Sequence, residues 1–309
     1  MSTLGPSSTV PDDARGAAIA LGNFDGVHRG HQAVIASARA VAEQRGVPVG
    51  VAIFEPHPRR FFQPDAPPFR LQSSAQRARA LAACGVAEVY EIGFDESLAR
   101  STDREFAQRL IHDCIGAVHV SVGADFRFGR GRMGDVESLK RLGAEFGFTV
   151  EAVAPVGGAE KISSTAVREA IAAGDMARAA DLLGRPWAIE GEVRRGFARG
   201  RGFGFPTANL ALGDYVRPRL GIYAVRVDLG DGVLLPGVAS VGVNPTVGSL
   251  PAPVLEAHLL DFSGDLYGRL IEVELIAFLR DEAKFDDTDA LKTQMTQDVI
   301  EARRALIGS

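Results

Sequence analysis

The sequence is poor in cysteine and lacks any apolar run of membrane-spanning length. Its two cysteines, Cys84 and Cys114, are too few for a disulfide scaffold, and neither stands in a zinc-binding pattern. The first residues carry no basic and apolar segment of the secretory type. We therefore expect a protein of the reducing cytoplasm that has no membrane partner.

A basic surplus and a lysine-based phosphate loop are missing as well. The formal net charge is -5, which argues against general affinity for nucleic acid. Lysine occurs only at positions 140, 161, 284 and 292, and no Gly-x-x-x-x-Gly-Lys-Ser/Thr motif is present. The 309 residues, 46% of them hydrophobic, suffice for two domains with their own cores. The first dozen residues are expected to form a loose tail, and the oligomeric state stays open.

The most informative stretch is residues 22–31, which follows an apolar run and precedes a helical pattern from Gln32 to Gln44. A strand that turns into a helix through glycines presents backbone N–H groups to an anion. His28 and His31 can donate to phosphate oxygens whose charge grows in a transition state. Nucleotidyl transfer is the favoured interpretation; helix capping or half of a zinc site are the alternatives. Gly22, Gly26 and Gly30 would allow the backbone to approach the phosphate closely, and His28 and His31 are the candidate donors.

Strand and helix patterns then alternate as far as residue 154. Strands are expected at 47–54, 86–92, 118–122 and 148–154, and helices at 72–84, 102–115 and 136–146. This order predicts a doubly wound parallel α/β sheet. His57 follows the first of these strands, so it can share the carboxyl-end cleft with His28 and His31, or lie on the surface as a turn residue.

Two loops of this half contain motifs typical of nucleotide binding. Gly129-x-Gly131-x-x-Gly134 matches a dinucleotide fingerprint, but residues 125–128 separate it from its strand, which disfavours NAD-type binding. In residues 161–168, Ser164 or Thr165 can cap the next helix. With Arg168 one turn further on, the same groups would form a second cradle for a triphosphate.

The pattern changes after a helix at 175–183, where Gly184 places a domain boundary: 1–184 and 185–309. Short strands are expected at 188–194, 222–229, 233–243, 254–261 and 271–279, which predicts a small antiparallel β-barrel. A final helix from 288 to 306 is expected to pack on the barrel through core contacts alone. Its apolar stripe comprises Leu291, Met295, Ile300 and Leu306.

Polar residues of the second half could hold a metal ion and phosphates. Thr207 and Asn209 alternate in an extended segment, so both face one side, and their oxygens suit Mg²⁺. Arg199 and Arg201 could hold phosphates, or could belong to an ordinary surface loop. Glu256 is a candidate general base if it points into the barrel mouth, and a solvated glutamate if it points outward.

Together these stretches resemble the bacterial bifunctional riboflavin kinase/FAD synthetase family over nearly the whole chain. Residues 22–31, 54–58, 123–129 and 162–168 are similar to its adenylyltransferase half. Residues 183–186, 204–209, 221–223, 242–246 and Glu256 are similar to its kinase half. Departures at Ile53, Phe203 and Val247 concern the details of the pockets.

The resemblance implies that riboflavin and ATP give FMN, and that FMN and a second ATP give FAD and pyrophosphate. It assigns Glu256 as the base, Thr207 and Asn209 to Mg²⁺ with ATP, and Asn244, Pro245 and Thr246 to the flavin. In the first half, FMN needs no base, because its phosphate is already a nucleophile. There the resemblance implies positioning of ATP and flavin by His28, His31, Asn23, Asp25, His57, Asp125, Ser164, Thr165 and Arg168.

Three alternatives remain open from the sequence. One half could have lost its activity, the chain could be a flavin-binding regulator, or it could be a nucleotide-binding interaction module. Retention of His28, His31, Thr207, Asn209 and Glu256 favours an enzyme, since a binder has little use for the whole set.

Overall fold

The computed structural model describes residues 2–4, 10–11, 14–158, 161–194, 207–244, 252–283, 285 and 287–307. It divides into two compact units, Met1–Ala66 with Ser74–Ile162, and Pro67–Ser73 with Ser163–Ser309. The inserted segment Pro67–Ser73 packs within the second unit, where the Trp187 indole donates to the Leu71 carbonyl oxygen at 2.8 Å. Helices α7 (Ser164–Ala173) and α8 (Met176–Leu183), which precede the sequence boundary at 184, also belong to the second unit.

The first unit is built on one parallel sheet in the order β1-β4-β3-β2-β5-β6, which confirms the predicted doubly wound fold. Its strands are β1 (Ser2–Leu4), β2 (Ala18–Leu21), β3 (Val49–Glu55), β4 (Glu88–Gly93), β5 (His119–Gly123) and β6 (Thr149–Val153). Its helical segments are α1 (Arg29–Arg45), α2 (Pro58–Phe62), α3 (Ser74–Ala83), α4 (Glu96–Arg100), α5 (Asp103–Glu105), the π-helix η2 (Phe106–Ile115), the short turn η3 (Arg130–Arg132) and α6 (Val136–Phe146).

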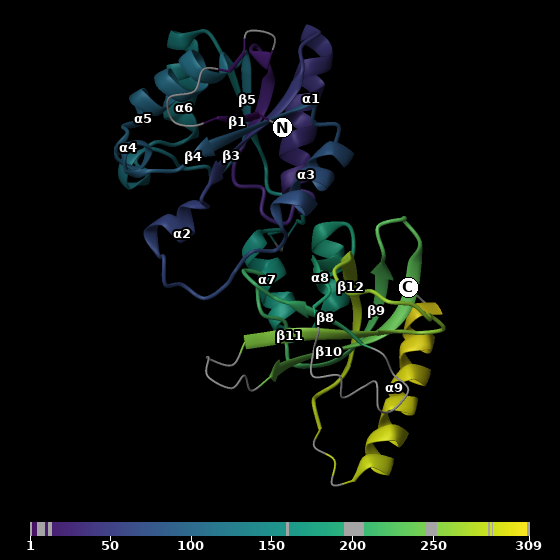
Figure 1. Cartoon of the computed structure of the whole chain (residues 1–309). Coiled ribbons are helices and arrows are strands. Elements are labelled where there is room, and N and C mark those ends of the chain that lie inside the picture. The colour runs from purple at the N-terminus through teal and green to yellow at the C-terminus, as the bar shows by residue number, and fades with distance from the viewer. Residues whose placement is uncertain are drawn as a thin grey trace. The chain divides into compact units, whose positions relative to one another are not determined.

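Helices cover both faces of this sheet (Figure 1). On one face, Ile35 of α1 and Leu81 of α3 pack on Val51 and neighbouring strand residues. On the other face, Ile111 of η2 and Leu139 of α6 belong to a second core cluster. That cluster contains the strand residues next in sequence to those of the first face, because successive side chains of a strand point to opposite faces. Strands buried on both faces explain why the sequence shows continuous apolar runs instead of alternation.

The strand order reverses between β2 and β5, because the chain builds β3 and β4 on one side of β2, and β5 and β6 on the other. Ligands of open α/β sheets bind at such a switch point, beyond the carboxyl ends of the strands. The loop before His28 leaves β2 and the loop with Asp125 leaves β5. Both predicted loops therefore flank the switch point.

Two expectations for this unit were wrong in detail. The start of the chain is not a loose tail throughout, because residues 2–4 pair in parallel with β4 and Val10 is buried. Helix α1 begins at Arg29 instead of Gln32, so His31 lies in its first turn. Capping by His28 allows this earlier start in spite of Gly30.

The second unit contains an antiparallel sheet in the order β7-β12-β9-β10-β11-β8, which agrees with the predicted antiparallel half. The Arg194 N–H donates to the Asn209 carbonyl oxygen at 2.9 Å, so a backbone bond joins the two edges of the curled sheet. Its strands are β7 (Trp187–Glu192), β8 (Thr207–Ala211), β9 (Gly221–Asp228), β10 (Leu234–Asn244), β11 (Ala252–Leu259) and β12 (Leu270–Arg280).

Helix α9 (Thr288–Ile307) lies against β9, β10 and β12 (Figure 1). The predicted apolar stripe is wrong at Ile300, which is exposed. Asp298 and Ala302 are instead the residues of α9 that are fully buried. The helix therefore carries a buried carboxylate on the face that covers the sheet, which core packing alone does not explain.

Candidate active sites

His28 ends the loop after β2 and caps α1. Its Nδ1 accepts the backbone N–H of His31 at 3.2 Å, and its ring stacks on the His31 ring with 3.6 Å between centroids. An Nδ1 that accepts carries no proton, so Nε2 is the nitrogen of His28 that can donate. The capping alternative is therefore true, and it also fixes the donor that a phosphate would meet.

The surrounding residues hold this pair firmly. His28 and Asp25 are almost fully buried, and the buried Phe24 ring lies 5.0 Å from the His31 ring. A Cβ at Gly30 would come within 3.1 Å of the His28 ring and 3.2 Å of the Ile162 carbonyl oxygen, so glycine permits this close approach. Asn23 Oδ1 is buried and accepts no hydrogen bond from the described residues, which leaves an acceptor at the loop.

Asp125 and His57 follow the strands on either side of β2. Lys161 donates to the Asp125 carboxylate, and this hydrogen bond holds the pKa of that carboxyl below its usual range. His57 lies after β3, as predicted, and caps the short helix α2 by accepting the Arg59 N–H at 3.0 Å. The carboxyl edge therefore brings His28, Asp125 and His57 to neighbouring strand ends.

The cap of α7 differs from the prediction. Ser163, and not Ser164 or Thr165, accepts the Ala166 N–H at 3.2 Å. Ser164 and Thr165 occupy the first helical turn, so capping does not account for their hydroxyls. Arg168 donates from Nε to the Phe69 carbonyl oxygen at 2.7 Å, within the second unit.

An aromatic surface that the sequence analysis missed lies after β3 and β4. Phe62 is 64% exposed, and its ring meets Phe61 and Phe94 edge to face at 5.2 and 5.7 Å. Phe54 continues the cluster from β3 into the core. The pair Phe61-Phe62 directly after a strand-ending proline motif was the available signal.

In the second unit, register places the expected catalytic residues on one sheet face. Asn209 lies directly opposite Glu256, and Thr207 directly opposite His258, in the β8–β11 ladder. Opposite partners in an antiparallel ladder point to the same face. Leu255 and Ala257, which stand on either side of Glu256 in the strand, are fully buried on the other face.

This face forms one side of a pocket of about 270 Å³. Glu256 therefore points neither to bulk solvent nor into the buried core, but under α9. Leu291, Met295 and Val299 of α9 form the apolar wall opposite the sheet. The other lining residues are Thr207, Ile222, Val238, Ser240, His258, Arg280, Glu282, Ala283, Phe285 and Asp298.

Some predicted residues lie outside the described part of the chain, namely Arg199, Arg201, Phe203, Pro245, Thr246 and Val247, and Asn244 is described only as the last residue of β10. Ile53 is buried in the core of the first unit. Among the described residues, no cluster of three His, Cys, Asp or Glu side chains could hold a metal, so the zinc alternative finds no support there. Nor is any described helix both long and apolar enough to cross a membrane.

Comparisons with known proteins cover both units. The FAD synthetase family model matches residues 10–166, and the riboflavin kinase family model matches residues 183–306. A bifunctional riboflavin kinase/FMN adenylyltransferase of Pseudomonas fluorescens is 46% identical over 290 residues, 94% of this chain and 93% of that protein. The Escherichia coli K12 protein of the same name is 44% identical over 93% of this chain and 92% of its own. A solved structure described as a macrolide-efflux protein from Streptococcus pneumoniae has a TM-score of 0.87 and 33% identity, covering 97% and 98% of the two chains.

Proposed function

The chain belongs to the bifunctional riboflavin kinase/FMN adenylyltransferase family, and we propose that each reaction uses one of the two sites described above. The enzyme phosphorylates riboflavin to FMN and adenylylates FMN to FAD, with ATP as the co-substrate that fits both steps. We place the functional halves at 1–184 and 185–309, which is supported by the ends of the two matches at 166 and 183.

Adenylylation is proposed at the switch point of the parallel sheet. The FMN phosphate attacks the α-phosphorus of ATP and pyrophosphate leaves, so the protein has to position charges and has no proton to remove. Nε2 of His28, with His31 beside it, would donate to the phosphate oxygens at the start of α1. The further residues proposed to bind ATP are Gly22, Asn23, Phe24, Asp25, Gly26, Gly30, His57, Ser164, Thr165 and Arg168.

The flavin of FMN is proposed to lie near Asp125 and the aromatic surface of Phe61, Phe62 and Phe94. A flat, largely apolar ring gains from stacking on exposed aromatic side chains. The 64% exposure of Phe62 is the observation that supports this placement, because a ring of that size is ordinarily buried. Asp125 stays ionised through Lys161, which suits a polar group of the ligand.

Phosphorylation of riboflavin is proposed in the pocket under α9. The observation that carries this placement is that Glu256 and Thr207 line this pocket, while the strand register sets Asn209 directly opposite Glu256. Glu256 would accept the proton of the ribityl 5′-hydroxyl while that oxygen attacks the γ-phosphorus of ATP in line. The bond from the γ-phosphorus to the bridging oxygen breaks, and ADP leaves. The apolar wall of α9 would cover the ring. Asn244, Pro245 and Thr246 are proposed on the flavin side, and Arg199 and Arg201 on the phosphates.

Thr207 and Asn209 fit a Mg²⁺ ion that accompanies ATP. Their hydroxyl and amide oxygens share a sheet face, and Mg²⁺ takes few protein ligands, because phosphate and water oxygens complete its shell. When bound, the ion would neutralise charge on the transferred phosphoryl group. We further propose that the enzyme works in the cytoplasm on small molecules, without nucleic acid or a membrane, in line with its net charge of -5.

The test is a time course of flavins separated by chromatography after riboflavin, ATP and Mg²⁺ are added to the purified chain. FMN should appear first and FAD after it, and omission of Mg²⁺ should slow the first step. Absence of product from riboflavin and from supplied FMN, with flavin still bound, would contradict the proposal and indicate a binding protein.

A further inference from the structure

One row of side chains crosses the pocket face from β12 to β11. Arg280 is paired with Ile222, Ile222 with Ser240, and Ser240 with Glu256. All four line the pocket. Neighbouring strands are about 4.8 Å apart, so the three steps from Arg280 to Glu256 span roughly 14 Å. The pocket thus has an arginine at the far end of the row from its candidate base.

A β-bulge brings Arg280 onto this face. The register of β12 against β9 shifts between Phe278 and Arg280, so Leu279 is the extra residue of the pair. Without the shift, Leu279 would stand opposite Ile222 and face the pocket. Bulges that re-aim a side chain are common next to active sites. Here the bulge exchanges an apolar side chain for a guanidinium.

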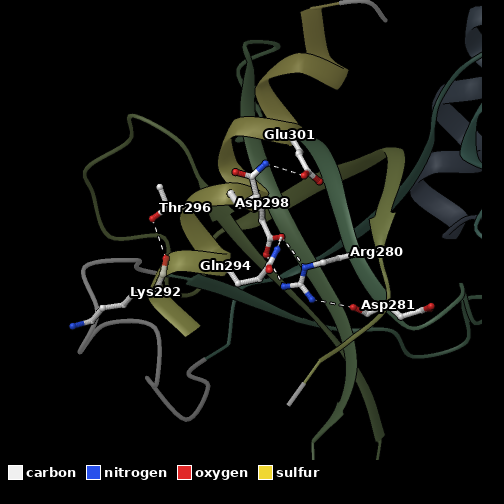
Figure 2. A network of polar contacts seen from close by, with 8 residues as sticks. Arg280, Asp281, Lys292, Gln294, Thr296, Asp298 and Glu301 are labelled. Carbon is white, nitrogen blue, oxygen red and sulfur yellow. Dashed lines mark hydrogen bonds and ion pairs between the residues drawn. The ribbon is translucent and has the colours of Figure 1, made fainter. Parts of the chain in front are cut away.

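The guanidinium is held in one orientation by α9 (Figure 2). Nε and one terminal nitrogen donate to the two carboxylate oxygens of Asp298, each at 2.7 Å, and Gln294 donates to the same carboxylate at 3.0 Å. The other terminal nitrogen donates to the Asp281 carbonyl oxygen at 2.9 Å. The hydrogen bonds to Asp298 raise the pKa of Arg280, so it stays charged.

These contacts use three of the five N–H groups of Arg280. Arg280 is also the one arginine or lysine among the described residues that line the pocket. The flavin ring has a methylated edge and an opposite edge with two carbonyl oxygens, which need donors. Ile222, Met295 and Val299 suit the flat faces of the ring, and Arg280 suits that polar edge.

We propose that Arg280 binds the carbonyl edge of the flavin ring in the kinase pocket, and that Asp298 is a positioning residue that orients its guanidinium. This inference rests on the placement of riboflavin under α9 proposed above. It explains why α9 buries the carboxylate of Asp298, because that carboxylate fixes the guanidinium of Arg280. A flavin ring held by Arg280 at one end of the row has its ribityl chain placed at a set distance from Glu256 at the other end.

The test compares Arg280→Lys and Asp298→Asn with the unchanged chain, using riboflavin, 2-thioriboflavin and 4-thioriboflavin as kinase substrates. Sulfur accepts hydrogen bonds weakly, so each analogue removes one acceptor. For riboflavin, KM should rise roughly tenfold or more, since a hydrogen bond from a charged group is lost. The KM for ATP should stay unchanged, and kcat should change little. With at least one thio analogue as the substrate, the KM values of the two variants and of the unchanged chain should differ by much less than they do with riboflavin.

Matched controls separate recognition from support of the helix. Arg303→Lys and Asp261→Asn alter another ion pair, which joins α9 to the turn after β11, and neither residue lines the pocket. They should leave the riboflavin KM unchanged. Conversion of supplied FMN to FAD, together with the urea midpoint, reports in every variant whether the chain is folded.

If the two variants raise KM by the same factor for riboflavin and for both thio analogues, the proposal is overturned and Arg280 is a purely structural residue. An unchanged riboflavin KM in Arg280→Lys would overturn it as well. Val299→Trp, which fills the pocket, distinguishes the underlying placement: an unchanged riboflavin KM in that variant would mean that riboflavin binds elsewhere, so both proposals would fail.

Discussion

The imidazoles of His28 and His31 stack at 3.6 Å with 15° between their planes, while His28 Nδ1 accepts the His31 N–H. One histidine therefore begins the helix and orients the other. This geometry ties the loop that we propose binds phosphate to the cap of α1, so a substitution at His28 can act through chemistry or through the cap.

His28→Asn separates these two effects, because asparagine is a good N-cap but lacks the imidazole donor. We expect its thermal midpoint to stay close to that of the unchanged chain. FAD formation from FMN should fall by roughly 10²–10³, the usual loss for one donor to a transition state. Riboflavin phosphorylation measured in the same sample should be unaffected. Unimpaired FAD synthesis would remove His28 from the mechanism.

Glu256→Gln should stop FMN formation, since glutamine has a similar shape and cannot take the hydroxyl proton. The loss of kinase kcat should be roughly 10²–10⁴. Conversion of supplied FMN to FAD serves as the control and should continue at the normal rate. Equal loss of both activities would contradict separate sites.

Gly221→Ala should destabilise the second unit. The φ angle of Gly221 is 149°, and a Cβ there would overlap the Arg280 carbonyl oxygen and lie 2.6 Å from the Phe278 ring. Overpacking of this kind costs roughly 1–3 kcal/mol or more. The control is Gly230→Ala, at φ 93° with no atom within 4 Å, which bears only the backbone strain. Urea unfolding should show the larger drop in midpoint for Gly221→Ala.

His119 should make stability depend on pH. It is buried, with Nδ1 2.7 Å from Thr149 Oγ1 and Nε2 3.0 Å from Ser121 Oγ. Burial, assisted by Arg45, lowers its pKa in the folded state. Between the lowered pKa and the unfolded value of about 6.5, the unfolded chain binds more protons. Its contribution is therefore complete above about pH 6.5 and is lost as the pH falls toward the folded pKa.

The measurement is the free energy of unfolding from urea titrations between pH 5 and 8. His119→Gln keeps a neutral polar side chain and should flatten the fall on the acidic side. An identical pH profile in the variant would show that other groups cause the dependence.

Much of the fold and part of the candidate site's geometry were predictable because they depend on local pattern. Glycines between a strand and a helix predicted the loop at His28, and alternating strands and helices predicted the parallel sheet. The shared side of Thr207 and Asn209 followed from the two-residue period of a strand. The cap at Ser163 was missed because three consecutive hydroxyl residues offer the same local chemistry.

The sequence by itself determined most of the order of strands and helices (though not β1), the two candidate site loops and the face shared by Thr207 and Asn209. These features depend on neighbours along the chain. Only the tertiary structure decided that Glu256 points under α9, that Ile300 points away and that Arg280 meets Asp298. Those outcomes depend on strand register, on a β-bulge and on the packing of a distant helix. All three arise from contacts between residues far apart in the sequence, and such contacts produce no periodic pattern of residues that could be recognised beforehand.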